Sequence, residues 1–104
     1  MLLGIDTVAK NESGDELEKV GDPENILSRF VTAAEYPDAT VCLRFIDAYG
    51  DACFNQLQIP FLVRELENAV AKATTPKVKQ HLREVADLVK RVQMPHTYVW
   101  FVGD

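Results

Sequence analysis

The side chains in this 104-residue chain whose types and spacing most suggest chemistry are Asp47 and Asp51. They flank Ala48-Tyr49-Gly50, which is typical of a tight turn, so their carboxylates would face each other across its mouth. Like charges placed opposite one another are unfavourable and favour a bound cation, so the pair suggests a weak Ca²⁺ or Mg²⁺ site or an acid–base pair. The spacing lacks the alternating oxygens and distal glutamate of an EF-hand loop. Because aspartate at a turn accepts backbone N–H groups, we interpret both as turn formers and keep the cation site as the alternative.

The histidines and cysteines form no familiar catalytic or metal-binding pattern. His81 falls within a predicted helix and His96 follows a proline just before the last predicted strand, and neither has a second ligand at a short metal-site spacing. Cys42 lies two residues before Arg44, but a cysteine nucleophile also needs a base. We therefore predict no catalytic residue, no metal site and no cofactor. We also predict two reduced thiols that do not bond to each other, with Cys53 the more buried.

Several enzyme classes are excluded by motifs that the chain does not contain. Its five glycines form neither a GxGxxG dinucleotide-binding pattern nor a P-loop. Its two serines, Ser13 and Ser28, stand outside any Gly-x-Ser-x-Gly nucleophile elbow. The sequence therefore favours a protein without catalytic activity.

Residues 40–57 read as a strand, a tight turn and a second strand, and this predicted hairpin sets which side chains share a face. A bulge at Gly50 would pair Phe45 with Cys53 and Leu43 with Asn55, and we expect that face to pack on the core. The opposite face would carry Arg44, Ile46 and Phe54.

The last predicted strand, residues 97–102, adds aromatic side chains to this second face. Aromatic residues and arginine with few lysines or glutamates are typical of the centre of a protein–protein interface. We therefore predict one interaction surface, made of Arg44, Ile46, Phe54, Tyr98 and Trp100.

The remaining elements follow from helix signals and apolar spacing. Residues 2–9 are expected to be a strand, and residues 10–21 either a loop or a turn followed by a short edge strand through Leu17 and Val20. Prolines at 23, 60 and 76 open three predicted helices. The order β-α-β-β-α-α-β predicts an α+β fold, in which three helices pack on one side of a largely antiparallel sheet of about four strands. We expect one globular domain over residues 1–104.

Charge and hydropathy limit the environment and the partners. The chain has a net charge of −5, and its first 40 residues hold nine acidic against three basic residues, so binding to nucleic acid is not expected. Lys79, Arg83 and Lys90 form a basic stripe on the third predicted helix, which we interpret as a solvated face. No apolar run is long enough for a membrane helix and no leader is apparent, so we expect a cytoplasmic protein without membrane association.

These observations favour a small non-enzymatic protein-binding or adaptor protein, such as an inhibitor or an immunity-type protein that acts on another protein. The partner would be a basic protein, because opposite charge speeds association, or a second copy of the chain. The alternative is a small enzyme or a ligand- or metal-binding domain with a site near residues 45–55. Its polar residues would be Asp47, Asp51, Asn55, His96 and Tyr98.

Overall fold

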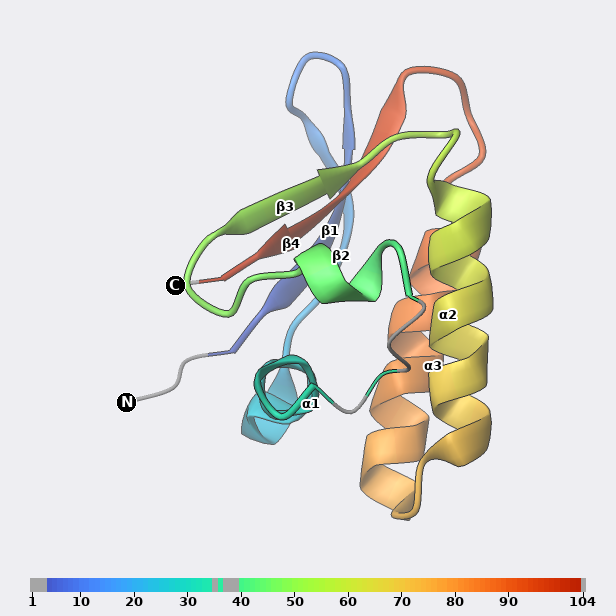
Figure 1. Cartoon of the computed structure of the whole chain (residues 1–104). Helices are drawn as coiled ribbons and strands as arrows, with labels where there is room; N and C mark the ends of the chain where they lie inside the picture. The colour runs from blue at the N-terminus through green and yellow to red at the C-terminus, as the bar shows by residue number, and fades with distance from the viewer. Residues whose placement is uncertain (1–3, 35, 37–39, 104) are drawn as a thin grey trace.

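The fold is an α+β arrangement of four antiparallel strands with helices on one side (Figure 1). The computed structural model describes residues 4–34, 36 and 40–103. Along the chain the elements are β1 (Asp6–Asn11), β2 (Glu16–Val20), the 3-10 turn η1 (Pro23–Asn25), α1 (Ile26–Thr32), the 3-10 turn η2 (Leu43–Phe45), β3 (Asp51–Phe54), α2 (Ile59–Lys72), α3 (Pro76–Arg91) and β4 (Thr97–Val102). The strands lie in the order β2-β1-β4-β3, so the last strand sits inside the sheet. The predicted fold class is confirmed.

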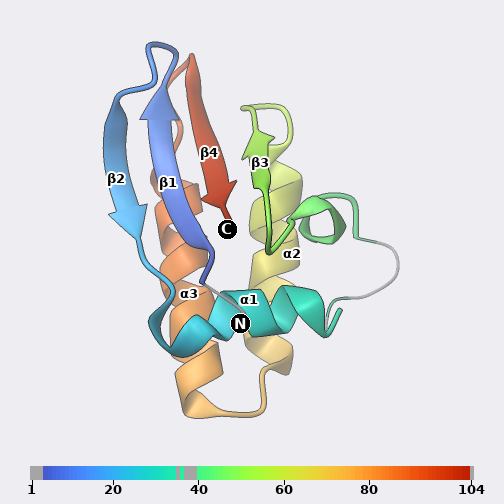
Figure 2. The same ribbon diagram turned by 90° about the vertical axis from the view of Figure 1, so that its left-hand side faces the viewer.

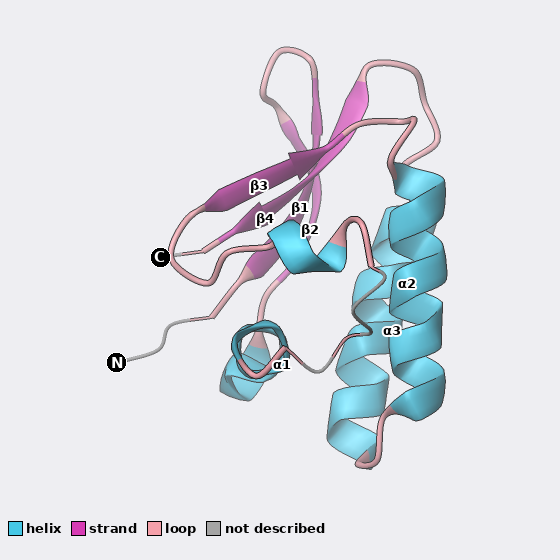
Figure 3. Ribbon diagram, viewed as in Figure 1, coloured by secondary structure: helices cyan, strands magenta, loops and turns pink. Residues whose placement is uncertain are grey.

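The helices begin where the sequence signals them. Pro60 is the second residue of α2, and Pro76 is the first residue of α3. The Thr75 hydroxyl accepts the N–H of Val78 at 3.4 Å, which satisfies one of the free amides in the first turn of α3. α2 and α3 then run antiparallel as a hairpin that covers one face of the sheet (Figure 3).

The strand register separates a buried face from an open one. Phe101 pairs with Thr7 and Ala52, and Val99 with Ala9 and Phe54, and this set faces the helices. The core between the two layers is built mainly from Leu62, Leu66, Leu82, Val85, Val89, Val99 and Phe101.

The opposite face of the sheet carries no described helix. Trp100 lies there between its strand partners Val8 and Cys53. Figure 2 looks onto this face, with α2 and α3 behind the strands.

The predicted hairpin over residues 40–57 is wrong, and so is the element order derived from it. Residues Leu43–Phe45 form a 3-10 turn, and only Asp51–Phe54 form a strand. The N–H groups of Val41 and Leu43, which a first strand would need for its ladder, donate instead to the Glu65 carboxylate of α2. The additional strand of the observed sheet is β2, which confirms the edge-strand reading of residues 10–21.

The turn before β3 packs directly on the end of β4. The Gly103 N–H donates to the Gly50 carbonyl at 2.8 Å, and a Cβ at Gly103 would lie 2.5 Å from the Asp47 carbonyl oxygen. Only glycine permits that approach. The turn itself is stabilised by Asp47, whose carboxylate accepts the N–H of Tyr49 at 2.9 Å. This is the turn-forming role that the sequence favours for Asp47.

The burial of the two cysteines is the opposite of what the sequence predicted. Cys42 is buried, whereas Cys53 is exposed on the open sheet face. Both are free thiols, so the predicted absence of a bond between them is confirmed.

Candidate functional site

The five residues of the predicted interaction surface do not share one surface. Ile46 and Phe54 are each 4% exposed and belong to the core. Arg44 lies on η2, on the helix side of the molecule. Tyr98 and Trp100 are half-buried on the open face of the sheet. The predicted surface is not formed, because β3 presents Phe54 to the helices and because the chain before β3 is not a strand.

The polar residues of the alternative enzyme or metal site are also separated. Asp51 pairs with Val102 at one end of β3, and Asn55 follows the other end of the strand. His96 lies beyond that second end, exposed, with its Nδ1 atom 3.5 Å from the Glu12 carboxylate. Within the described part of the chain, no three histidine, cysteine or carboxylate side chains are grouped so that they could hold a metal ion. Asp51 therefore lies at the opposite end of β3 from Asn55 and His96.

Four of the exposed large apolar side chains come from the segments around η2 and the start of α2, two elements that contact each other. Val41 is 55% exposed, Phe45 66%, Leu57 82% and Phe61 49%. We call these four residues the η2–α2 patch. Phe61 precedes Glu65 by four residues, so the two lie on one side of α2, and Leu57 is in the turn that leads into this helix.

Glu65 holds the patch together. Its carboxylate accepts the N–H groups of Val41 at 2.7 Å, Cys42 at 3.1 Å and Leu43 at 2.9 Å. The Cys42 thiol adds a contact to the Gln58 carbonyl at 3.8 Å. Charge-assisted hydrogen bonds are about twice as strong as neutral ones, so this carboxylate fixes the segment that carries Val41 and Phe45 onto α2.

Two arginines border the patch. The Arg44 guanidinium lies 6.0 Å from the centre of the Phe45 ring, and that of Arg64 lies 5.7 Å from the centre of the Phe61 ring. Both distances are in the range of a cation–π contact. The corner thus has the aromatic and arginine composition that the sequence led us to expect on the sheet face.

The open sheet face is a more polar surface. The Lys10 ammonium lies 5.1 Å from the centre of the Trp100 ring, and Lys19 pairs with Asp6 at 3.4 Å. Lysine therefore covers the one tryptophan, and charged side chains flank the apolar centre on β1 and β2.

Neither cysteine has the character of an activated nucleophile. Burial and the nearby Glu65 charge raise the pKa of the Cys42 thiol to about 11. Burial also raises the pKa of Cys53, although the charge of Lys10 opposes the shift. Because the thiolate is the reactive form, both cysteines are protonated and weakly nucleophilic at neutral pH.

A buried Asp22–His81 contact is the main polar feature that the sequence did not reveal. The two side chains are 0% and 2% exposed, and Asp22 Oδ1 lies 3.2 Å from His81 Nε2. The geometry is that of a close electrostatic contact rather than an aligned hydrogen bond. The Asp-Pro pair signals a helix cap, but no local signal connects Asp22 with a histidine 59 residues later.

The Asp22 carboxylate also accepts three backbone N–H groups. These come from Ile5 at 2.9 Å, Leu27 at 2.7 Å and Ser28 at 3.0 Å. Burial alone would raise the pKa of Asp22, but the His81 contact and the three amides outweigh it and hold the pKa below its ordinary value. The residue therefore joins the start of β1, α1 and α3, which is a structural role.

Comparison with protein-family models, with curated proteins and with solved structures found no match. None of the described helices is both long and apolar enough to cross a membrane.

Proposed function

We propose that this protein is a non-catalytic protein-binding domain of the adaptor or inhibitor type, and that the η2–α2 patch is its contact surface. The observation that carries the proposal is the exposure of Val41, Phe45, Leu57 and Phe61 on segments that Glu65 fixes in place. Exposed apolar side chains gathered on one surface are typical of sites where proteins associate.

Pre-organisation is the reason why this corner suits binding. Full burial of one large apolar side chain contributes about 1.5–3 kcal/mol, but association also costs the freedom of loops and side chains that become ordered. The Glu65 hydrogen bonds restrict the segment at residues 41–43 before any partner arrives. More of the burial energy is then available for affinity.

The border of the patch suggests the chemistry of the partner at the contact. Arg44 and Arg64 favour a partner surface with an apolar centre and carboxylates at its edge. A basic partner is still predicted from the acidic residues 1–40. In this proposal, the basic surface would be a second region of the same partner. The two free thiols are typical of a reducing compartment and support a cytoplasmic location.

The test compares single variants in affinity capture from the native cell and in sedimentation velocity. Phe45→Ala and Phe61→Ala should each reduce recovery of the same co-purifying protein, or self-association, by about tenfold, because each removes an anchor ring. Met94→Ala is the matched control, since Met94 is 70% exposed and lies outside the patch. If both phenylalanine variants retain native recovery while Trp100→Ala loses it, the open sheet face is the contact surface and the proposal fails.

A further inference from the structure

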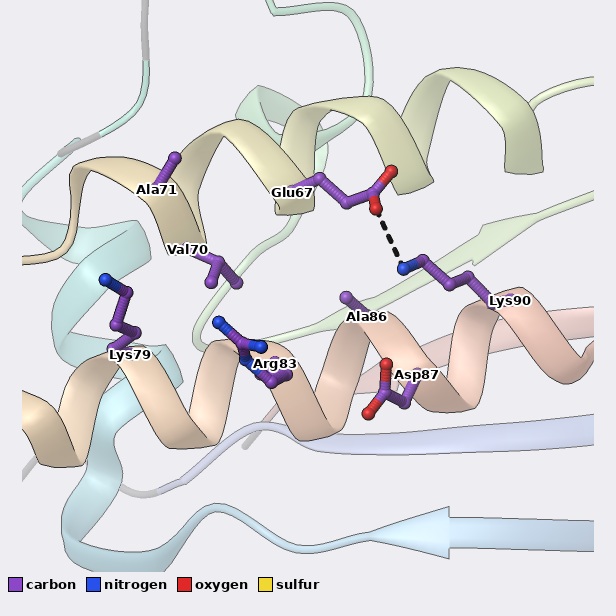
Figure 4. A pocket seen from close by; sticks show the side chains of 8 residues that line it. All are labelled: Glu67, Val70, Ala71, Lys79, Arg83, Ala86, Asp87 and Lys90. Atoms are coloured by element: carbon purple, nitrogen blue, oxygen red, sulfur yellow. Dashed lines mark ion pairs between the residues drawn. The ribbon is translucent and has the colours of Figure 1, made fainter.

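A hollow of about 440 Å³ lies on the α2–α3 hairpin, and its base is made of small side chains (Figure 4). Val70 of α2 and Ala86 of α3 point toward each other at this base, and Ala71 lines the hollow from α2. On α3 the long side chains of Arg83 and Lys90 lie one turn before and one turn after Ala86, so the row of long side chains is interrupted there. The hollow results from that interruption.

The hollow carries two positive charges that no described carboxylate neutralises. Lys79 and Arg83 are exposed, line the hollow and are four residues apart, so they repel each other on one helix face. Neither of them forms an ion pair within the part of the chain that the structure describes. Three other basic residues of α3 do form such pairs: Lys77 with Glu24 at 3.2 Å, Lys90 with Glu67 at 2.8 Å, and Arg91 with Glu18.

One of the two carboxylates of the hollow, that of Glu67, is held by another cation. Glu67 reaches across from α2 to Lys90, as the dashed line in Figure 4 shows, and this pair forms one end of the hollow. The hydrogen bonds of Glu18 raise the pKa of Arg91, and the charge of Asp87 contributes to the same shift. Asp87 remains in the lining one turn after Arg83, so the hollow holds three cationic and two acidic side chains, a net charge of +1.

We propose that this hollow binds a small organic anion, with a phosphate or carboxylate group between Lys79 and Arg83 and an apolar body over Val70, Ala71 and Ala86. The planar guanidinium of arginine donates two parallel hydrogen bonds to such a group, and lysine adds a mobile positive charge. The volume is within the range of small-molecule sites in proteins. This site is independent of the η2–α2 patch, because Glu67 and Val70 lie on a different side of α2 from Phe61.

The first experiment follows backbone amide shifts of the ¹⁵N-labelled protein by NMR during titration with phenyl phosphate, benzoate and benzyl alcohol. The shifts should concentrate at residues 67–71 and 79–87, and they should be largest for the doubly charged phosphate and smallest for the neutral alcohol. The phosphate and benzoate titrations distinguish the two anion types. Equal effects of all three probes, or shifts scattered over the whole chain, would overturn the proposal.

Variants separate the two parts of the site. Arg83→Gln and Lys79→Gln should each weaken phenyl phosphate binding by about fivefold to tenfold, because each removes one charged donor. Lys77→Gln is the matched control, since Lys77 lies on the same helix but pairs with Glu24. If Lys77→Gln weakens binding as much as Arg83→Gln, the attraction is a general effect of charge and the proposed site is rejected.

Ala71→Leu tests the apolar base without changing charge. Ala71 is exposed, so a larger side chain can be accommodated without disturbing the core. The leucine enlarges the α2 side of the lining, so it should weaken phenyl phosphate while leaving inorganic phosphate unaffected. If both ligands bind to Ala71→Leu as to the native protein, the anion does not occupy the hollow.

Discussion

Two carboxylates, Asp22 and Glu65, each accept three backbone N–H groups, yet they organise regions of opposite character. The Asp22 side chain is fully buried and rests against His81. Glu65 is only partly buried and holds an exposed segment onto α2. The same type of interaction, one carboxylate that accepts three backbone N–H groups, thus stabilises the core in one region and fixes exposed apolar side chains in the other.

Backbone geometry explains how Asp22 reaches its three amides. Glu24 and Asn25 both have a φ of 56°, in the left-handed region that is costly for residues other than glycine. The chain therefore reverses between Asp22 and α1, and the carboxylate returns to the amides of Leu27 and Ser28. These hydrogen bonds offset the cost of the turn.

The comparison predicts that removal of Asp22 has the larger effect on stability. Asp22→Ala leaves three amides without their acceptor and the buried His81 without its neighbouring carboxylate, so the free energy of unfolding should fall by about 3–5 kcal/mol. Urea denaturation followed by circular dichroism measures the change. Asp15→Ala is the control at an exposed aspartate and should stay within about 0.5 kcal/mol of the native protein. A loss below 1 kcal/mol for Asp22→Ala would show that Asp22 does not join the three elements energetically.

The second prediction concerns the pH dependence of this contribution. The pKa of Asp22 in the folded protein lies below the ordinary value of 3.8, so the unfolded chain takes up the proton first as the pH falls. The stabilisation is therefore complete above about pH 5 and is lost as the pH falls through the folded-state pKa. The difference in free energy of unfolding between the native protein and Asp22→Asn should shrink as the pH falls below about 4. A difference that does not change down to pH 2 would contradict the assignment.

The third prediction is that loss of the Glu65 charge has a smaller effect on the free energy of unfolding but a larger effect on the order of the segment at residues 41–43. Glu65→Gln removes the charge that strengthens three hydrogen bonds, so it should cost about 1–2 kcal/mol. Amide hydrogen exchange at Val41, Cys42 and Leu43 should accelerate by about tenfold, while exchange at Leu27 and Ser28 stays unchanged. Glu67→Gln is the matched control two residues along α2, where the carboxylate bonds only to Lys90 at the surface.

The Cys42 thiol reports on the same region by a second measurement. Cys42 is buried at the Glu65 contact, whereas Cys53 is exposed, so iodoacetamide should label Cys53 first in the native protein. In Glu65→Gln the labelling of Cys42 should accelerate, because the segment opens and the negative charge that raises its pKa is gone. Unchanged labelling together with unchanged exchange would show that Glu65 does not fix the patch.

Some of the fold could be predicted from local pattern. The Asp-Pro and Thr-Pro pairs signal helix starts, and the β-branched and aromatic residues at 97–102 signal a strand, because these effects involve only near neighbours. Asp22 does cap a helix, although α1 begins only at Ile26. The absence of nucleotide-binding and nucleophile-elbow motifs is likewise readable from the chain alone.

The candidate site could not be predicted, because its interactions join residues far apart in the chain. The pattern at residues 40–46 alternates in a way that is typical of a strand, but Glu65, more than 20 residues later, takes its backbone donors. Arg44 is exposed, whereas Ile46 and Phe54, which the strand pattern places on the same face, are buried in the core.

The amino-acid sequence by itself determined the α+β class, the starts of α2 and α3 and the acidic character of the chain, because near-neighbour spacing and composition are sufficient for these properties. Only the tertiary structure decided which apolar side chains remain exposed, which carboxylates hold backbone amides and where a cationic hollow opens between α2 and α3. Those properties depend on contacts between distant segments, and the energy of such contacts exceeds the small local preferences that a sequence pattern records.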